Sequence, residues 1–335
     1  MTIKDIARLS GCSVSTISRV INDRQDVRPE TKEKVLRIMR EVGFVPNTNA
    51  QQLKIQQSRN IVFVVKGTRN MFFADLLVHL QSCTAEYGYN GVISYLDENA
   101  DELEAAEKIV RELKPKGIIF LGGNVDIFRQ GFATVGVPSV LTTVATDELH
   151  FANLSMVGVD DRRAAFDAIT YLIHRGHRRI AILGGPASSH PSQMRRCGAI
   201  DAMAAAGIRF DPVLYGLCNY DFEPAYHAMN ALLAQGRKFT AVFAMSDPIA
   251  IGAMRALVSA GRRVPEDVSV LGFDGVTLSR YCIPVLTTVF QPAAQIARKS
   301  VELLVSQIEH CTPARTLIVP HQILEGSSVA TRTGG

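Results

Sequence analysis

The chain has 335 residues, 47% of them hydrophobic and 20% charged, which is typical of a globular protein with buried cores and excludes a disordered one. No apolar run approaches the ~18 residues that a membrane span needs, and an early acid without a following apolar stretch argues against a signal peptide, so we expect a cytoplasmic protein with no membrane partner. The net charge of +4 is uneven: residues 1–60 hold eleven Lys and Arg against six Asp and Glu (+5), the remainder twenty-five against twenty-six (−1), which indicates a polyanionic partner for the N-terminal segment.

Residues 1–45 predict three short helices. Thr2 begins the first helix in the pattern of a capping box, and Gly11 ends it in a tight turn. The second helix is expected over residues 14–22, and Pro29 suits the first turn of the third. Three short helices with a glycine turn between the first two describe a helix-turn-helix domain.

The second of these helices is expected to enter the major groove of DNA. Its inward positions are apolar, and its outward residues are Val14, Ser15, Ser18 and Arg19. An arginine there can donate two hydrogen bonds to guanine, worth about 1–3 kcal/mol of discrimination. Short polar side chains suit phosphate oxygens, and the candidates are Ser13, Thr16, Ser18 and Asn22. The spacing alone leaves a second interpretation open, a three-helix bundle with a solvated polar face.

Residues 2–7 and 11–22 resemble the DNA-binding head of the LacI/GalR family of bacterial transcriptional regulators. The resemblance implies that Val14, Ser15 and Arg19 read bases.

Residues 46–59 predict a linker. Pro46 favours an extended residue before it, and the short helix-prone stretch that follows is marginal in water by itself. The resemblance implies that this stretch is a hinge helix, which pairs with its dimer mate in the minor groove. It implies DNA contacts for Asn47, Ala50, Leu53 and Lys54, with Leu53 as the wedge that opens a base step. An ordinary packing role for Leu53 is the alternative.

From residue 60 onward, apolar strand-like runs alternate with helical patterns in two successive series, which predicts parallel sheets covered by helices in two lobes. The expected strands are residues 61–65, 92–95, 117–121, 139–141 and 157–159, then 180–183, 213–217, 241–244 and 268–271. The expected helices are residues 72–87, 164–175, 193–206, 223–235 and 248–260. Ligands of such folds bind beyond the carboxyl ends of the strands, so we expect a site between the lobes.

Motifs for other chemistry are missing from the sequence. It contains no Walker A sequence, no GxGxxG, no serine elbow and no HExxH, so neither a nucleotide cofactor nor an enzyme is indicated. The six cysteines show no metal-binding spacing, and we expect buried, reduced thiols.

The body also resembles the LacI/GalR family, at residues 176–181, 184–186, 246–253, 264–274 and 286–289. The resemblance implies a fold like that of periplasmic binding proteins, in which the chain crosses between the lobes three times. The first lobe would comprise residues 60–160 with about 292–312. The second would comprise residues 161–291 with about 313–330.

The resemblance also nominates a pocket. Its members would be Phe72, Phe73, Asp160, Arg195, Phe222, Asp247 and Asp274. These residues suit a polyol, because carboxylate and guanidinium groups each engage two hydroxyls and an aromatic face stacks on a sugar ring. Other interpretations remain open: Arg195 as a surface charge, Phe222 as a core residue and Asp274 as a turn cap.

The loop after the first strand departs from the family. Many relatives have an acid or Asn and a Pro there, whereas this chain has two cations, Lys66 and Arg69. Two cations near the mouth of the pocket favour an acidic or phosphorylated ligand, unless both are exposed.

We therefore predict a homodimeric repressor that binds a pseudo-palindromic operator in double-stranded DNA. A small ligand, expected to be a sugar or a sugar derivative, would control its affinity for the operator. No leucine heptad follows the body, so we expect no tetramer built by a coiled coil. Two alternatives are a sugar-binding protein of transport and an α/β enzyme that uses Asp247 and Asp274.

Overall fold

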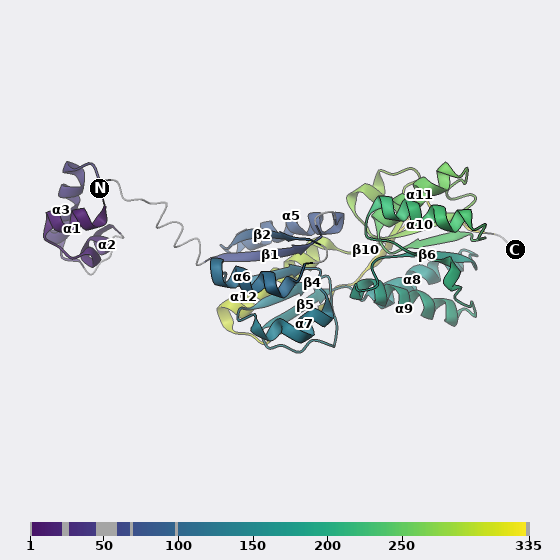
Figure 1. Cartoon of the computed structure of the whole chain (residues 1–335), viewed down its shortest axis with the longest axis horizontal. Coiled ribbons are helices and arrows are strands. Elements are labelled where there is room, and N and C mark those ends of the chain that lie inside the picture. Colours follow the sequence, from purple (N-terminus) through teal and green to yellow (C-terminus); the bar gives the residue numbers. More distant parts are fainter. Residues whose placement is uncertain (1, 22–26, 45–58, 68–69, 98–99, 333–335) are drawn as a thin grey trace. The chain divides into compact units, whose positions relative to one another are not determined.

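The computed structural model describes residues 2–21, 27–44, 59–67, 70–97 and 100–332. The chain divides into two compact units, Met1–Gln57 and Ser58–Gly335, which we call the head and the body. Figure 1 shows the three helices of the head and the two α/β lobes of the body.

The head contains the three predicted helices, α1 (Ile3–Ser10), α2 (Val14–Ile21) and α3 (Pro29–Glu41). The Asp5 carboxylate accepts the Thr2 backbone N–H at 2.9 Å at the start of α1, and Gly11 ends the helix with a left-handed φ of 68°. One small core of apolar side chains joins the helices, and it contains Ile6, Ala7, Ile17, Val20, Val35 and Met39. The predicted helix-turn-helix head is confirmed.

The first lobe is built on a six-stranded sheet in which every paired strand is parallel. In spatial order its strands are β11 (Thr316–Ile318), β5 (Leu154–Gly158), β4 (Ser139–Thr142), β3 (Gly117–Leu121), β1 (Asn60–Lys66) and β2 (Asn90–Leu96). Alternate residues of β1 point to opposite faces: Ile61, Phe63 and Val65 belong to one core and Val62 and Val64 to another.

Helices cover both faces of this sheet, as the continuous apolar strands require. The core of Phe63 includes α5 (Met71–Glu86) and α12 (Ala293–His310). The core of Val62 includes α6 (Glu102–Leu113) and α7 (Val125–Gly131), which the single-turn helix η1 (Phe132–Thr134) follows.

The second lobe repeats this architecture. Its sheet has the order β12 (Gln322–Leu324), β10 (Thr287–Phe290), β9 (Ser269–Asp274), β8 (Ala241–Ala244), β6 (Ile180–Gly184) and β7 (Tyr215–Leu217), with only β12 antiparallel to its neighbour. Helices α8 (Asp161–His174) and α9 (His190–Ala205) cover one face; α10 (Phe222–Ala234) and α11 (Asp247–Ser259) cover the other. A single-turn helix, η3 (Thr277–Arg280), follows β9. These two lobes confirm the predicted fold class.

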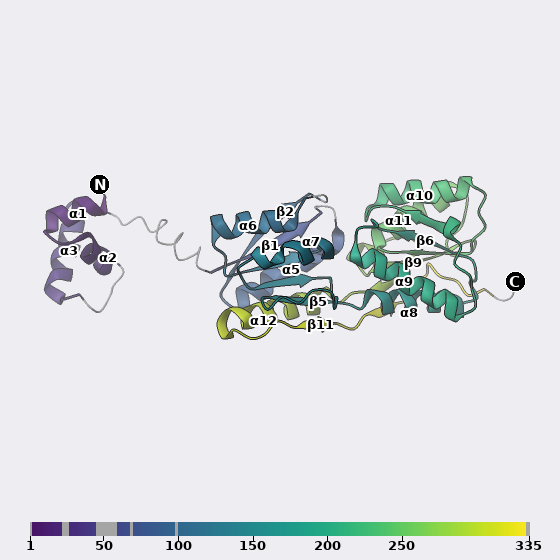
Figure 2. The ribbon, with the colours of Figure 1, turned by 60° about the horizontal axis from the view of Figure 1, so that its bottom comes forward.

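The chain passes between the lobes three times, from β5 to α8, from β10 to α12 and from β11 to β12. Figure 2 shows α12 and β11 alongside β5, although they are distant from it in sequence. We expected residues from about 313 onward in the second lobe, and this prediction is wrong for β11. The backbone of Thr316–Ile318 pairs with Met156, Val157 and Gly158, so the last crossing comes after Ile318.

Two further expectations need correction. Residues 213–217 are not one strand, because Asp211 accepts the Val213 N–H at 3.1 Å and starts the single-turn helix η2 (Pro212–Leu214) ahead of β7. Not all cysteines are buried: Cys197 and Cys311 are exposed.

Among the described helices, none has the length and apolar character to cross a membrane.

Candidate functional site

Helix α2 presents a polar surface whose start is fixed by Ser13. The Ser13 hydroxyl oxygen accepts the Thr16 backbone N–H at 3.1 Å, which makes Ser13 the N-cap of the helix. Ser13 also lies within hydrogen-bond distance of the Ser15 and Thr16 hydroxyls, at 2.7 and 2.8 Å. Ile17 and Val20 face the core, which turns the hydroxyls away from it.

The structure brings six of the predicted DNA-binding residues together on α2 and its cap. Ser13, Val14, Ser15 and Arg19 are exposed, and Thr16 and Ser18 are half-buried. The arrangement places a guanidinium group and several hydroxyls on one surface, where they can donate hydrogen bonds to base edges and phosphates. The remaining predicted contacts, Asn22, Asn47, Ala50, Leu53 and Lys54, lie outside the described residues.

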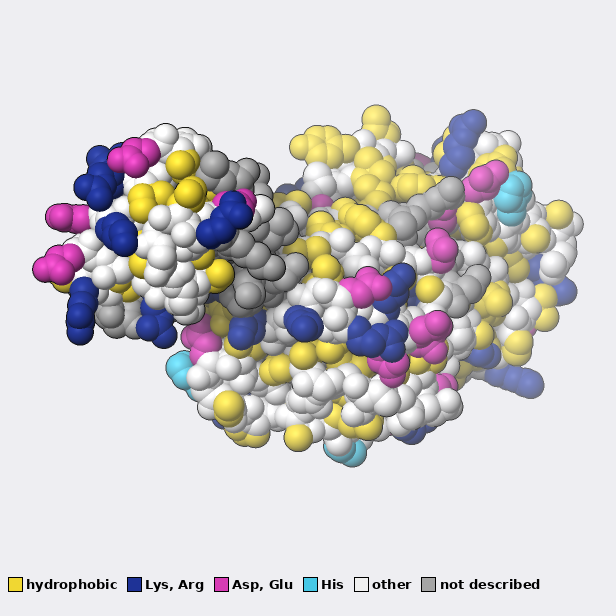
Figure 3. Space-filling view, turned by 60° about the vertical axis from the view of Figure 1, so that its left-hand side comes forward, with side chains coloured by type: hydrophobic (Ala, Val, Ile, Leu, Met, Phe, Trp, Pro, Cys, Tyr) yellow, Lys and Arg dark blue, Asp and Glu magenta, His cyan; other side chains and the backbone are white. Residues whose placement is uncertain are grey.

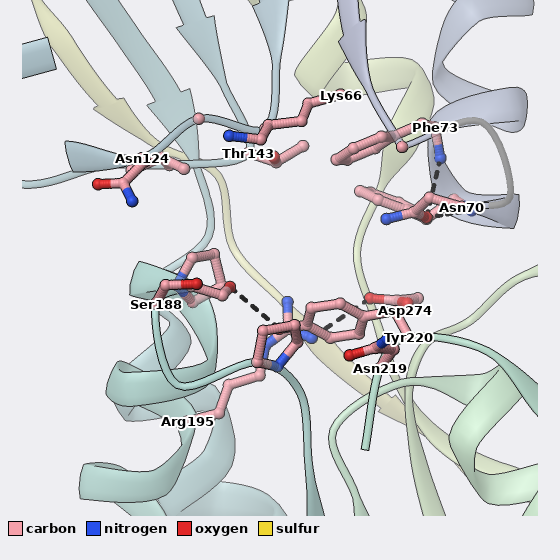
Figure 4. A pocket seen from close by; sticks show the side chains of 18 of the residues that line it. Lys66, Asn70, Phe73, Asn124, Thr143, Ser188, Arg195, Asn219, Tyr220 and Asp274 are labelled. Carbon is pink, nitrogen blue, oxygen red and sulfur yellow. Dashed lines mark hydrogen bonds and ion pairs between the residues drawn. The ribbon is translucent and has the colours of Figure 1, made fainter. Parts of the chain in front are cut away.

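A cavity of about 310 Å³ lies between the two lobes of the body. Its lining comes from the carboxyl ends of parallel strands in both sheets, as expected for sheets of this kind. Figure 4 shows Lys66, Asn124 and Thr143 on the wall of the first lobe, facing Ser188 and Arg195 on the wall of the second.

Arg195, on α9, lies at the centre of the second wall. Its Nε donates to the Asp161 carboxylate at 2.7 Å, and one terminal nitrogen donates to the Met245 carbonyl and lies 3.6 Å from Asp274. The guanidinium carbon is 3.6 Å from the centroid of the Phe273 ring, a cation–π contact. With a side chain only 6% exposed, Arg195 is held in one orientation with an edge at the cavity.

Asp274 ends β9 beside this guanidinium. The Gln291 side-chain amide donates to it at 2.8 Å. Burial raises the pKa of Asp274 to about 7, although Arg195 and the hydrogen bond from Gln291 oppose the shift. The carboxyl group therefore changes charge near neutral pH and can either accept or donate a hydrogen bond there.

Backbone strain also concentrates at the cavity. Among the described residues other than glycine, four have a left-handed φ, of which Lys114 and Cys311 cap helices. The other two, Thr143 (φ 76°) and Asp274 (φ 105°), both line the cavity. Strain of this kind costs about 1–3 kcal/mol per residue and gathers at ligand sites.

The aromatic part of the first wall is set by a helix cap. The Asn70 side-chain oxygen accepts the backbone N–H groups of Phe72 and Phe73, at 3.0 and 3.3 Å, and so starts α5 at the cavity. Phe73 lies against Gly122, where a Cβ atom would come within 3.1 Å of the ring. Phe72 and Phe73 both line the cavity.

Three predicted pocket residues are not among those that line the cavity. Asp160 is exposed and caps α8 by accepting the Arg163 N–H at 2.9 Å. Phe222 begins α10, and its carbonyl lies close to Gly252 of α11, so it contributes to the packing of these two helices.

Asp247 is completely buried and does not line the cavity. Its carboxylate accepts the Val276 N–H at 2.8 Å and the Thr288 hydroxyl at 2.5 Å, which ties α11 to the loop after Asp274 and to β10. Burial raises its pKa well above the usual range, and nearby Asp274 raises it further. Asp247 therefore supports the strand ends that carry Asp274 and Gln291.

The sequence reasoning missed several lining residues. Asn219 and Tyr220 follow β7, and Gln291 follows β10. The Tyr220 hydroxyl lies 2.5 Å from the Ser192 hydroxyl and 3.3 Å from that of Ser189, which anchors its ring in the wall. Their place directly after strands was the only signal in the sequence.

Comparison with known proteins supports both halves of this description. A family described as "Bacterial regulatory proteins, lacI family" matches residues 2–47, and a "Periplasmic binding protein-like domain" matches residues 169–329. The HTH-type transcriptional regulator MalR of Clostridium butyricum is 38% identical over 331 residues, 98% of this chain and 99% of MalR.

Solved structures agree over the same length. The lac repressor dimer bound to operator and the anti-inducer ONPF has a TM-score of 0.78 at 26% identity. The complex of the regulator CelR with cellobiose has a TM-score of 0.74 at 29% identity. In each case the match covers 98% of this chain and 99% of the other. The chain therefore belongs to the lacI family of bacterial regulatory proteins and is a DNA-binding transcriptional regulator.

Proposed function

We propose that a small carbohydrate effector binds between the two lobes and controls the affinity of the head for an operator. The observation that carries this proposal is the cavity itself, whose polar and aromatic lining comes from both lobes. A ligand that contacts both walls stabilises one arrangement of the lobes over others, and that difference in affinity is what shifts an equilibrium between two states.

The chemistry of the walls suits a polyhydroxylated ring. Phe72, Phe73 and Tyr220 offer apolar ring surface. Arg195 and Asp274 offer hydrogen-bonding groups that match vicinal hydroxyls. The CelR structure is a cellobiose complex, which supports the same ligand class for this cavity. Asp160, Phe222 and Asp247 are not part of the proposed contact set.

For DNA we propose that α2 lies in the major groove. Val14, Ser15 and Arg19 would contact base edges, and Ser13, Thr16 and Ser18 phosphates. Asn22 and the linker residues Asn47, Ala50, Leu53 and Lys54 complete the proposed DNA-binding set. Phosphate contacts release counterions, so we expect affinity for DNA to fall as salt rises.

We further propose that the regulator is a homodimer formed by the body. Large apolar side chains are exposed on α5 (Val78, 66%), on α11 (Val258, 54%) and between η3 and β10 (Tyr281, 76%; Ile283, 93%). Figure 3 shows hydrophobic side chains gathered along the upper edge of the body in that view. Exposed apolar patches mark interaction sites, and the lac repressor structure is that of a dimer. A second copy of the chain is the occupant we propose for this surface.

The proposal is tested by selecting random duplex DNA with the purified full-length protein and sequencing what is retained. A dimer with two identical heads predicts enrichment of a two-fold symmetric site. The selected duplex is then titrated with protein in the presence of maltose, cellobiose or ribose, and we expect at least one sugar to change the dissociation constant. No enrichment at low salt would contradict the regulator function, and enrichment without any effect of carbohydrates would contradict the effector.

A further inference from the structure

Lys66 lines the cavity at the carboxyl end of β1 and forms an ion pair with Glu102. Its ammonium nitrogen lies 2.9 Å from Oε1 of Glu102, the first residue of α6. The Lys66 side chain is 19% exposed, whereas that of Glu102 is completely buried. Figure 4 shows Lys66 on the same wall of the cavity as Thr143 and Asn124.

Within the described part of the chain, the Glu102 carboxylate has one hydrogen-bond donor besides Lys66. Its Oε1 also accepts the backbone N–H of Asn124 at 2.8 Å. Its Oε2 is buried and has no hydrogen-bond partner among the described residues. Apart from the N-terminal end of α6, on which it lies, Lys66 is the positive group in the described part of the chain that offsets the charge of this buried carboxylate. An uncompensated buried charge is costly. The positive charge of Lys66 is therefore not available to a second anion.

Arg195, the second cation among the described lining residues, is balanced in a similar way. Among the described lining residues, the only charged side chains are Lys66, Arg195 and Asp274. Arg195 is paired with the buried Asp161 at 2.7 Å and lies beside Asp274. The two cations, Lys66 and Arg195, therefore lie beside three carboxyl groups, which belong to Glu102, Asp161 and Asp274. Among the described lining residues, an anionic ligand would therefore meet no positive side chain that lacks a carboxyl partner, whereas hydroxyl groups need none.

We propose that Lys66, neutralised by Glu102, is a specificity-determining residue that selects an uncharged, hydroxyl-bearing effector over a phosphorylated or acidic one. An ammonium group has three donors, and Lys66 uses one for Glu102, which leaves donors for hydroxyl oxygens of the ligand. This inference deepens the proposed function and depends on the cavity being the effector site. It reverses, for Lys66, the expectation that cations at the mouth favour an acidic ligand.

The test uses inorganic phosphate as the probe and requires no knowledge of the effector. Glu102→Gln keeps the shape of the side chain and removes its charge, so Lys66 becomes an unmatched cation on the cavity wall. Calorimetric titration of the full-length protein with phosphate, against chloride at equal ionic strength, should show about tenfold tighter phosphate binding to this variant than to the wild type. The double variant Lys66→Met/Glu102→Gln should lose the gain.

A matched control distinguishes a change of charge in the cavity from the same change of net charge elsewhere on the protein. Glu302→Gln removes one acid that pairs with Lys299 at 2.8 Å on the exposed face of α12, and it should not change phosphate binding. Saturable phosphate binding by the wild type that Lys66→Met abolishes would overturn the proposal. So would the absence of any gain in Glu102→Gln.

A measurement on the wild type covers the case in which Glu102→Gln does not fold. The rate of acetylation at Lys66 is followed by mass spectrometry in chloride and in phosphate. Equal rates support the proposal, and protection specific to phosphate overturns it. The phosphate and acetylation measurements do not involve DNA. If they come out as predicted while no carbohydrate changes the operator affinity, the proposed effector function is contradicted and the charge pairing of Lys66 with Glu102 still holds.

Discussion

Arg19 is the residue of α2 to which we assign most of the sequence discrimination. It is exposed on the polar surface, opposite the buried Ile17 and Val20. Replacement by alanine removes a guanidinium that can donate two hydrogen bonds to guanine, and it should weaken operator binding by about 1–3 kcal/mol, or roughly 5- to 150-fold. Fluorescence anisotropy of the selected duplex measures the change.

Arg37→Ala provides the control for Arg19. Arg37 is also exposed and lies on α3, 3.9 Å from Glu41, so its loss removes the same charge from the head. We expect it to weaken binding to specific and random duplexes alike. Equal effects of the two variants on specificity would remove Arg19 from the base-reading set.

Asp274 should make the stability of the body depend on pH. Its pKa is about 7 in the folded protein because it is buried, against 3.8 for the free side chain. Because this pKa is raised, Asp274 makes its full contribution to the free energy of unfolding below the pKa of the unfolded chain. That contribution is lost as the pH rises through the pKa of the folded protein. Asp274→Asn does not titrate, so its stability relative to the wild type should increase between about pH 4 and 7, the window that these two pKa values define.

Calorimetric melting at several pH values tests this prediction. A relative stability of Asp274→Asn that stays flat over the same pH range would show that Asp274 is charged throughout.

At the scale of single residues, the sequence placed four of the seven nominated pocket residues at the cavity, and their contact with a ligand stays a prediction. Phe72, Phe73, Arg195 and Asp274 were nominated and do line the cavity. The sequence could not separate Asp247 from Asp274, because each is an aspartate three residues after the end of an expected strand, at residues 244 and 271. Only the fold shows that the Asp247 carboxylate turns inward to the Val276 N–H and the Thr288 hydroxyl.

At the scale of elements, the start of α5 couples local structure to the site. Asn70 caps the helix and so sets where Phe72 and Phe73 meet the cavity. Asn70→Ala should lower the free energy of unfolding by about 1 kcal/mol and also weaken effector binding. Asp160→Ala removes a comparable cap from α8, away from the cavity lining, and should lower stability without changing effector affinity. Melting and calorimetric titration give the two readouts. Equal effects on affinity would contradict the assignment.

Most helices and strands could be predicted because their periodicity is strong. The expected strands at residues 117–121 and 241–244 coincide with β3 and β8. Helices α6, α7 and α12 and strands β10, β11 and β12 were not among the expected elements. The last two have three residues each and are half-exposed, so they carry no periodic signal and depend on pairing with β5 and β10.

For the whole molecule, the proposed dimer depends on the exposed apolar surface of the body. Ile283→Asp places a charge on the most exposed large apolar side chain in the described part of the chain. Burying that charge in an interface is costly, so we expect a folded monomer in sedimentation experiments and weaker operator binding. Leu217→Asp, on the edge strand β7, is the matched control and should remain dimeric. A dimer that survives Ile283→Asp would place the interface elsewhere.

The most direct test of the central claim is the operator affinity of the full-length protein measured with and without carbohydrate, in wild type and in Asp274→Ala. We predict that at least one of maltose, cellobiose and ribose changes the dissociation constant of the wild type. We also predict that Asp274→Ala binds the operator normally without sugar and has lost this response. An operator affinity that no carbohydrate alters, or a response that persists in Asp274→Ala, would contradict control of DNA binding through this cavity.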